Sequence, residues 1–219
     1  MVHVGSIKKI ILMTLNFFFD KIYVINLERR KDRYLQVCAE LNKYQIDFEI
    51  FKAIDGNPGI NLSADHPLKN KPGAVGCILS HVKILEEAKK LNLKNVLILE
   101  DDVEFYPDYL EKFKKAASNL PSDWDLFYLS GNTDSDKLQH FSGNIFRCFG
   151  TFTTHAYAVN NNMFDEIIEG QLKLEHPADV FYNKITLPKC KGYIIRPYLC
   201  RQRASHSDIV NGFRNYDLK

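Results

Sequence analysis

The sequence predicts an α/β fold in which a mostly parallel central sheet is flanked by helices. Strand and helix patterns alternate through the first half of the chain. In addition, residues 96–99 are all aliphatic, which is typical of a strand covered on both faces. With 219 residues, of which 45% are hydrophobic, the chain is long enough for one well-cored domain. We expect that domain to span residues 21–219, after an N-terminal apolar extension over residues 1–20.

The extension carries an apolar run over residues 10–19, preceded by Lys8 and Lys9. A helix needs roughly twenty apolar residues to span a bilayer, so a transmembrane segment is excluded here. We expect a core or interface segment. The alternative is a peripheral membrane contact through residues 8–19.

The first half then gives the pattern strand, helix, strand, long polar loop, helix, strand. The expected ranges, in that order, are 21–27, 28–44, 47–54, 57–71, a helix from Pro72, and 96–99.

The second half is expected to add helices, strands and one polar loop. These are a helix over 107–118, a strand over 124–130, a loop over 131–143, strands over 145–152 and 155–159 paired as a hairpin, a helix over 160–170, a short helix from Pro177, and a strand over 193–195.

Three consecutive acids, Glu100, Asp101 and Asp102, follow directly after the apolar run 96–99. Ligands of α/β sheets bind beyond the carboxyl ends of the strands, so these acids stand where chemistry is usually placed. Two carboxylates about 4 Å apart repel by roughly 4 kcal/mol at an effective dielectric near 20, so the cluster needs a cation or protons. A hard divalent ion such as Mg²⁺ or Mn²⁺ is the simplest answer. The alternative is a solvated acidic turn.

Arg29, Arg30 and Arg33 lie at the junction of the first strand and the first helix. Guanidinium groups and helix amino ends both favour anions, so this junction is a candidate site for nucleotide phosphate. The alternative is a solvated first helical turn.

The composition of the chain indicates which partners we do not expect to bind it and in which cell compartment we expect it. The net charge is only +2 and the basic residues are dispersed, so nucleic acid is not an expected partner. The five cysteines are odd in number and contain no Cys-x-x-Cys, which argues against a disulfide framework and a zinc site. We expect a cytoplasmic protein.

Five segments together resemble glycosyltransferase family 25, which includes bacterial lipooligosaccharide galactosyltransferases and collagen galactosyltransferases. They are Tyr-Val-Ile-Asn-Leu-Glu-Arg-Arg-Lys-Asp-Arg at 23–33, Gly-Cys-Ile-Leu-Ser-His at 76–81, Leu-Ile-Leu-Glu-Asp-Asp-Val at 97–103, Trp-Asp-Leu at 124–126 and Ala-Tyr-Ala at 156–158. The resemblance covers about residues 21–211. It implies a GT-A-type fold and a metal-assisted, inverting transfer of galactose or glucose from a UDP-sugar to a saccharide or glycoprotein acceptor.

The resemblance also implies roles for individual residues. Asp102 would bind Mn²⁺ or Mg²⁺, with Asp101 beside it and His206 as a further ligand. Asp179 would be the general base. The donor nucleotide sugar would contact Asn26, Arg29, Arg30, Arg33, Ser80, His81, Glu100 and Asp101.

Three other functions compete with this one. A catalytically silent carbohydrate- or protein-binding module would keep the fold but would not need the acids, all of which are present. A nucleotidyltransferase would carry a glycine-rich phosphate loop after the first strand, where this chain has arginines. A glycoside hydrolase needs two carboxylates about 5 to 9 Å apart, which a contiguous triplet does not by itself supply.

Overall fold

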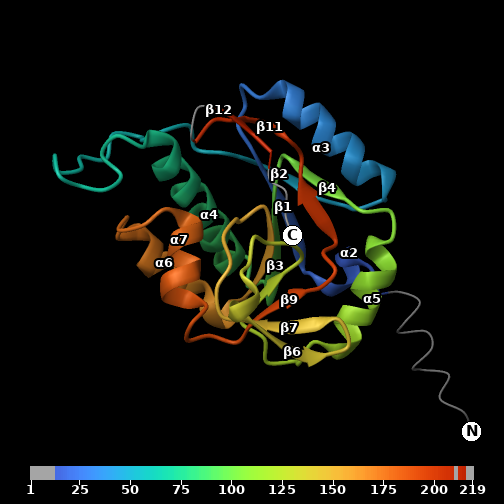
Figure 1. Ribbon diagram of the computed structural model, residues 1–219. Coiled ribbons are helices and arrows are strands. Elements are labelled where there is room, and N and C mark those ends of the chain that lie inside the picture. The colour runs from blue at the N-terminus through green and yellow to red at the C-terminus, as the bar shows by residue number, and fades with distance from the viewer. Residues whose placement is uncertain (1–12, 210–211, 216–219) are drawn as a thin grey trace, which may run out of the picture.

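The computed structural model describes residues 13–209 and 212–215, and an eight-stranded sheet forms its centre (Figure 1). The strand order is β2-β1-β3-β8-β5-β9-β7-β6. The strands of this sheet are β1 (Lys21–Asn26), β2 (Glu49–Lys52), β3 (Asn95–Glu100), β5 (Leu126–Tyr128), β6 (Leu138–Ser142), β7 (Ile145–Cys148), β8 (Ala156–Asn160) and β9 (Gly192–Ile195). Two small sheets pair β4 (Val103–Phe105) with β10 (Cys200–Gln202) and β11 (Ser205–Ser207) with β12 (Gly212–Arg214).

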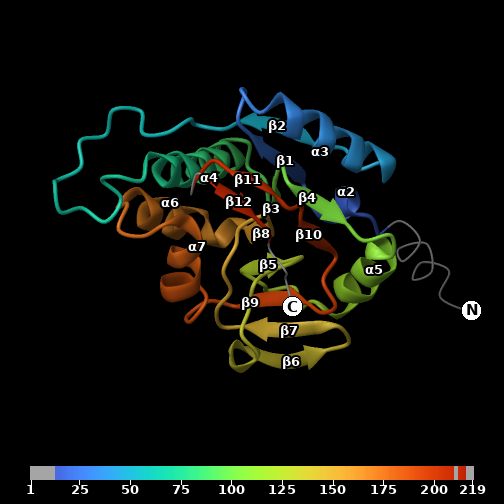
Figure 2. The same ribbon diagram turned by 45° about the horizontal axis from the view of Figure 1, so that its top comes forward.

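The sheet is mixed, but six of its eight strands point in one direction, and only β8 and β7 run against them. Helices cover both faces (Figure 2). They are α2 (Leu15–Phe18), α3 (Lys31–Lys43), α4 (Pro72–Lys90), α5 (Tyr109–Asn119), α6 (Phe164–Leu172) and α7 (Ala178–Phe181). The predicted α/β fold, a mostly parallel sheet flanked by helices, is confirmed.

Alternating strand residues divide the core into two layers. On β3, Leu97 and Leu99 pack with α2, α3 and α5, whereas Val96 and Ile98 pack with α4, α6 and α7. All four side chains are fully buried. This two-sided burial is why the run 96–99 is apolar at every position.

The sequence prediction was wrong about one pairing and one loop. The two strands expected as a hairpin do not pair, because β8 lies antiparallel between β3 and β5 while β7 pairs with β9 and β6. The segment expected as a loop contains β6, an edge strand whose residues are mostly exposed. An edge strand in solvent lacks the apolar pattern on which strand prediction depends.

The described part of the apolar N-terminal run packs into the core. Leu15 and Phe19 are 1% and 2% exposed, and Phe18 stacks near Trp124 while Phe17 is 56% exposed. Residues 1–12, which hold the start of the run, lie outside the described residues, so membrane contact through residues 8–19 stays a prediction. Among the residues that the structure describes, no helix is long and apolar enough to cross a bilayer.

Helix α4 is pressed directly against the chain that follows β2. A Cβ on Gly76 would lie 2.3 Å from the carbonyl oxygen of Ile54. One turn later, the Ser80 hydroxyl accepts a hydrogen bond from the Ile54 N–H at 2.9 Å and donates one to the Gly76 carbonyl at 2.7 Å. The glycine and the serine therefore fix residues 53–56 beside the carboxyl end of β3.

We expect Gly76→Ala to lower the free energy of unfolding by about 1–3 kcal/mol, because the added methyl group meets backbone atoms that must move. Urea unfolding measures this loss. Lys90→Ala, at the exposed carboxyl end of the same helix, is the control and should stay within about 0.5 kcal/mol of the wild type. Equal stabilities for the two variants would show that the close contact at Gly76 is unimportant.

Candidate functional site

A pocket with a volume of about 310 Å³ lies at the carboxyl ends of β1, β2 and β3. Its walls come from the β1–α3 junction, residues 53–56, one side of α4, the three acids after β3, and residues 202–209 of the C-terminal segment. The acids were expected at this edge of the sheet, and the structure places them there.

The register of the parallel strands brings Asn26 to the acids. Ile25 pairs with Glu100, so the next residues, Asn26 and Asp101, are also neighbours. The Asn26 side-chain amide donates a 2.7 Å hydrogen bond to Asp101 Oδ2. Asp101 and Asp102 are only 6% and 5% exposed, which rules out the solvated acidic turn.

Arg33 supplies the positive charge that the buried acids require. Its Nη1 lies 2.6 Å from Asp101 Oδ1 and 3.4 Å from Asp102 Oδ2, and its side chain is only 11% exposed. Sequence reasoning assigned Arg33 to the nucleotide and a metal ion to the acids. The structure shows that a guanidinium lies between Asp101 and Asp102 and supplies part of their counter-charge.

Even with Arg33 beside them, burial disfavours the charged forms of Glu100 and Asp102. Burial raises the pKa of Asp102, and burial together with the charge of Asp102 raises the pKa of Glu100. The Thr154 hydroxyl donates a 2.7 Å hydrogen bond to Glu100 Oε1. A further positive charge in the pocket would therefore be stabilised by these side chains.

Among the residues that the structure describes, two buried oxygens in this pocket have no hydrogen-bond donor, Asp102 Oδ1 and Gln202 Oε1. Oxygen atoms that only accept are the ligands that Mg²⁺ and Mn²⁺ prefer. In the described ranges, no group of three or more His, Cys, Asp or Glu side chains is arranged to hold a metal. The residues therefore fit a cation held by one carboxylate or two, with substrate phosphate and water completing its coordination.

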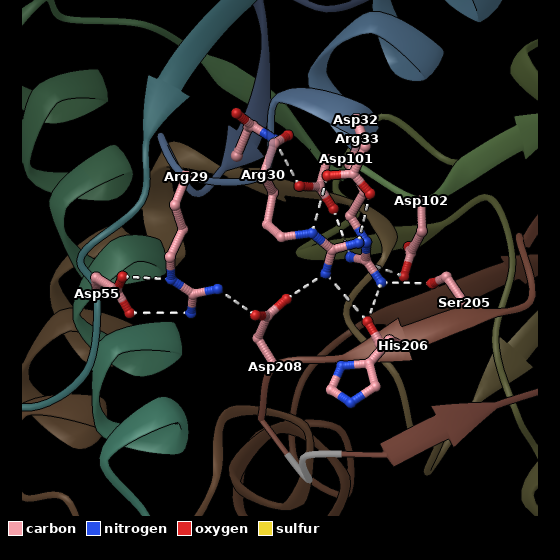
Figure 3. A network of polar contacts seen from close by, with 11 residues as sticks. Arg29, Arg30, Asp32, Arg33, Asp55, Asp101, Asp102, Ser205, His206 and Asp208 are labelled. Atoms are coloured by element: carbon pink, nitrogen blue, oxygen red, sulfur yellow. Dashed lines mark hydrogen bonds and ion pairs between the residues drawn. The ribbon is translucent and has the colours of Figure 1, made fainter.

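Arg29 and Arg30 are joined through one carboxylate that the sequence analysis missed (Figure 3). Asp208 forms ion pairs with both guanidinium groups, while Arg29 also binds Asp55 at 2.7 Å and Arg30 binds Asp32 at 2.8 Å. Asp208 lies 179 positions from Arg29, so its pairing with the two arginines depends on the fold and not on local sequence.

The C-terminal segment contacts Arg33 as well. The Arg33 Nη2 donates to the hydroxyl of Ser205 and, at 3.1 Å, to the backbone carbonyl of His206. The His206 ring is exposed and points away from the acids (Figure 3). Its carbonyl, not its imidazole, faces the site, and its role as a metal ligand stays a prediction.

Asp179 lies in the first turn of α7, outside the pocket lining. Its Oδ1 accepts a 2.8 Å hydrogen bond from the Val180 N–H. Burial and then the charges of Glu100 and Asp179 raise the pKa of the Cys77 thiol, which lines the pocket. The role of Asp179 as general base stays a prediction.

Ser80 and His81 both line the pocket from α4. The two hydrogen bonds of the Ser80 hydroxyl described above are structural ones. His81 is 1% exposed; its Nδ1 lies 2.8 Å from the Tyr157 hydroxyl, and its Nε2 has no partner.

We expect the two buried histidines, His81 and His155, to favour unfolding as the pH falls from 6.5 towards 4. Burial lowers the pKa of His81 to about 4 and that of His155 to about 3. In this range the unfolded chain, with histidine pKa values near 6.5, binds more protons than the folded chain, so acid favours unfolding. The contribution of each histidine to the free energy of unfolding should fall by on the order of 2 kcal/mol between pH 7 and pH 5. Urea unfolding of the wild type and of His155→Gln across this range measures the contribution of His155 as the difference between the two proteins. A difference that does not change with pH would contradict the assignment.

The sequence model of glycosyltransferase family 25, described as LPS biosynthesis protein, matches residues 19–202. The chain belongs to glycosyltransferase family 25. The resemblance seen in the motifs is thereby confirmed.

Other members of glycosyltransferase family 25 are similar to this chain. Human procollagen galactosyltransferase 2 is 26% identical over 201 residues, which cover 80% of this chain and 32% of that protein. A family 25 member from Anopheles gambiae is 35% identical over 127 residues, covering 49% and 21%. A human relative named inactive glycosyltransferase 25 family member 3 is 33% identical over 128 residues, covering 51% and 22%. The chain thus spans about a third or less of the length of these relatives.

Among solved structures, a glycosyltransferase involved in the glycosylation of the major capsid of PBCV-1 aligns with 80% of this chain and 79% of its own. The TM-score is 0.49 and the sequence identity is 12%.

Proposed function

We propose that this family 25 member is an inverting glycosyltransferase that moves a hexose, galactose or glucose, from a UDP-sugar to a saccharide or to a hydroxylated protein side chain. The observation that supports this most strongly is the buried Asp102 oxygen without a partner, which lines a pocket that also contains arginines. A carboxylate can bind a divalent cation, and guanidinium groups can bind phosphate. Together they suit a nucleoside diphosphate with its metal ion.

Within this proposal, Arg29 and Arg33 line the pocket and would bind the diphosphate. Both now pair with carboxylates, so the nucleotide would replace or share these ion pairs. Arg30 lies behind them and would orient Asp208. Asp101 and Asn26 would hold Arg33 in place.

Asp102 would hold Mn²⁺ or Mg²⁺ with Asp101 beside it. When bound, such an ion neutralises the charge that develops on the leaving diphosphate. Asp102 is buried, so little water would surround this charge. Electrostatic interactions in such a site are stronger than in bulk water.

We expect Asp179→Asn to lower the turnover number by about 100-fold and to leave the affinity for the UDP-sugar unchanged. An inverting transfer needs a base to take the proton of the acceptor hydroxyl, and asparagine cannot do so. Steady-state kinetics with a saturating donor measure this, with Glu169→Gln on the exposed side of the neighbouring α6 as the control. A normal turnover number for Asp179→Asn would assign the base elsewhere.

Turnover of UDP-galactose, UDP-glucose and UDP-N-acetylglucosamine, with Mn²⁺ or with EDTA, tests the proposal as a whole. We expect slow release of UDP from one of the two hexose donors, stopped by EDTA. Binding of a saccharide without turnover of any donor would instead identify a silent binding module. That alternative has one supporting observation, the relative that is named inactive.

A further inference from the structure

A row of buried hydrogen-bonding groups leads away from the pocket through His81. His81 Nδ1 lies 2.8 Å from the hydroxyl of Tyr157, which lies 3.0 Å from the hydroxyl of Tyr182. The three residues are at most 1% exposed. They come from α4, from β8 and from the π-helical turn Tyr182–Thr186 that continues α7, so the row ties three elements together.

The rings in this row are held rigidly. Tyr128 stacks on Tyr157 with ring centroids 5.6 Å apart, and Tyr182 meets Tyr157 edge to face at 5.1 Å. Tyr157 lies in the Ala-Tyr-Ala segment at 156–158, one of the segments that carried the family resemblance and that the proposed function leaves without a role.

The direction of the hydrogen bonds follows from counting the hydrogens. Within residues 13–209 and 212–215, the Tyr182 hydroxyl has the Tyr157 hydroxyl as a partner at 3.0 Å and the side-chain amide of Gln171 as a further donor, but it has no other acceptor. If Tyr157 donated to Tyr182, the Tyr182 hydrogen would be buried without an acceptor, which costs about 1–3 kcal/mol. If Tyr182 donates to Tyr157, then Tyr157 donates to His81 Nδ1, and each hydroxyl hydrogen has an acceptor. His81 then carries its proton on Nε2.

Nε2 is the only polar side-chain atom that His81 has left for the pocket, because Nδ1 is occupied by Tyr157. Nε2 is buried and has no hydrogen-bond partner in the described part of the chain, and His81 lines the pocket. A neutral N–H donor suits an uncharged oxygen such as a sugar hydroxyl, whereas the arginines suit the diphosphate.

We propose that Tyr157, oriented by Tyr182, is a positioning residue that fixes His81 in the Nε2–H tautomer, and that this N–H donates to a hydroxyl group of the donor hexose. The second half of this inference rests on the proposed function. The first half concerns the protein alone and is tested without any substrate.

The tautomer is measured from the ¹⁵N chemical shifts of the His81 ring in the full chain labelled with ¹⁵N-histidine, with His81→Gln identifying its signals. We expect one protonated nitrogen, Nε2, in the wild type, and a mixture of tautomers in Tyr157→Phe. Tyr128→Phe is the matched control, because it removes a buried hydroxyl that has no partner from the ring stacked on Tyr157. Protonation at Nδ1 in the wild type, or no difference between the two variants, would overturn the positioning role.

The contact with the hexose is tested by comparing the affinities for a UDP-hexose and for UDP, both with Mn²⁺. His81→Gln keeps an N–H donor near the Nε2 position, whereas His81→Asn places its amide near the Nδ1 position. We expect His81→Asn to weaken binding of the UDP-hexose about tenfold and leave UDP binding unchanged, and His81→Gln to retain most of the affinity. Equal losses for both ligands, or no loss in His81→Asn, would overturn the contact.

These measurements separate the two proposals. If the wild type binds neither UDP nor the UDP-hexose, the proposed function fails and the hexose contact fails with it, while the tautomer measurement still decides the role of Tyr157. If UDP binds normally and only the hexose effect is missing, the proposed function stands and the inference about His81 is wrong.

Discussion

Asp102→Asn is expected to lower the rate of hexose transfer by about 1000-fold while the protein stays folded. The substitution keeps the shape of the side chain but removes the negative charge of the carboxylate that lines the pocket, so a cation at this position would lose its ligand. Removing one preorganised electrostatic group from an active site typically costs about 100- to 1000-fold. The measurement is the transfer rate at saturating donor and Mn²⁺.

The matched control is Asp123→Asn, which changes an exposed aspartate that pairs with Lys191 at 2.6 Å and does not line the pocket. It should transfer at the wild-type rate. If Asp102→Asn also transferred at that rate and bound Mn²⁺ equally well, Asp102 would not be a metal ligand and the acids after β3 would serve Arg33 alone.

Arg33→Met is expected to lower the free energy of unfolding by about 3–5 kcal/mol, measured by urea unfolding in EDTA. The variant leaves Asp101 and Asp102 buried without their cation, which is the costly way to break a buried ion pair. Adding Asp101→Asn to Arg33→Met should recover part of the loss, because one of the two uncompensated charges is then removed. If a divalent cation binds Asp102, saturating Mn²⁺ should also return stability to Arg33→Met.

Arg201→Met provides the comparison for Arg33→Met. Arg201 pairs with Glu104 at 2.7 Å, but the arginine side chain is 54% exposed, so its loss should cost at most about 1 kcal/mol. A similarly small loss for Arg33→Met would show that solvent or protons, and not the guanidinium, compensate the buried acids.

The sequence predicted the elements that have strong periodicity and missed those defined by their neighbours. Helix α4 begins at Pro72, as expected, and the β3 run is buried on both faces. The place of β8 between β3 and β5 was missed because an inserted antiparallel strand has the same apolar pattern as any other central strand. The exposed edge strand β6 has too little apolar pattern to distinguish it from a loop.

The position of those site residues that directly follow a strand could be predicted from the sequence. The pairing of site residues that are distant in the sequence could not. Asp101 and Asp102 lie at the carboxyl edge of the sheet because they directly follow β3. Their partner Arg33 lies 68 positions before Asp101, so its pairing follows from the fold and not from local sequence. Asp208, which joins Arg29 and Arg30, is a similar case near the other end of the chain.

The measurement that tests the account most directly is calorimetric titration of the protein with UDP, in Mn²⁺ and then in EDTA. We expect saturable binding of one UDP per chain with Mn²⁺ and at least about tenfold weaker binding in EDTA, since a cation at Asp102 would contribute a few kcal/mol. Absence of UDP binding in the presence of Mn²⁺ would contradict the claim that the pocket beyond β1, β2 and β3 is a nucleotide-sugar site.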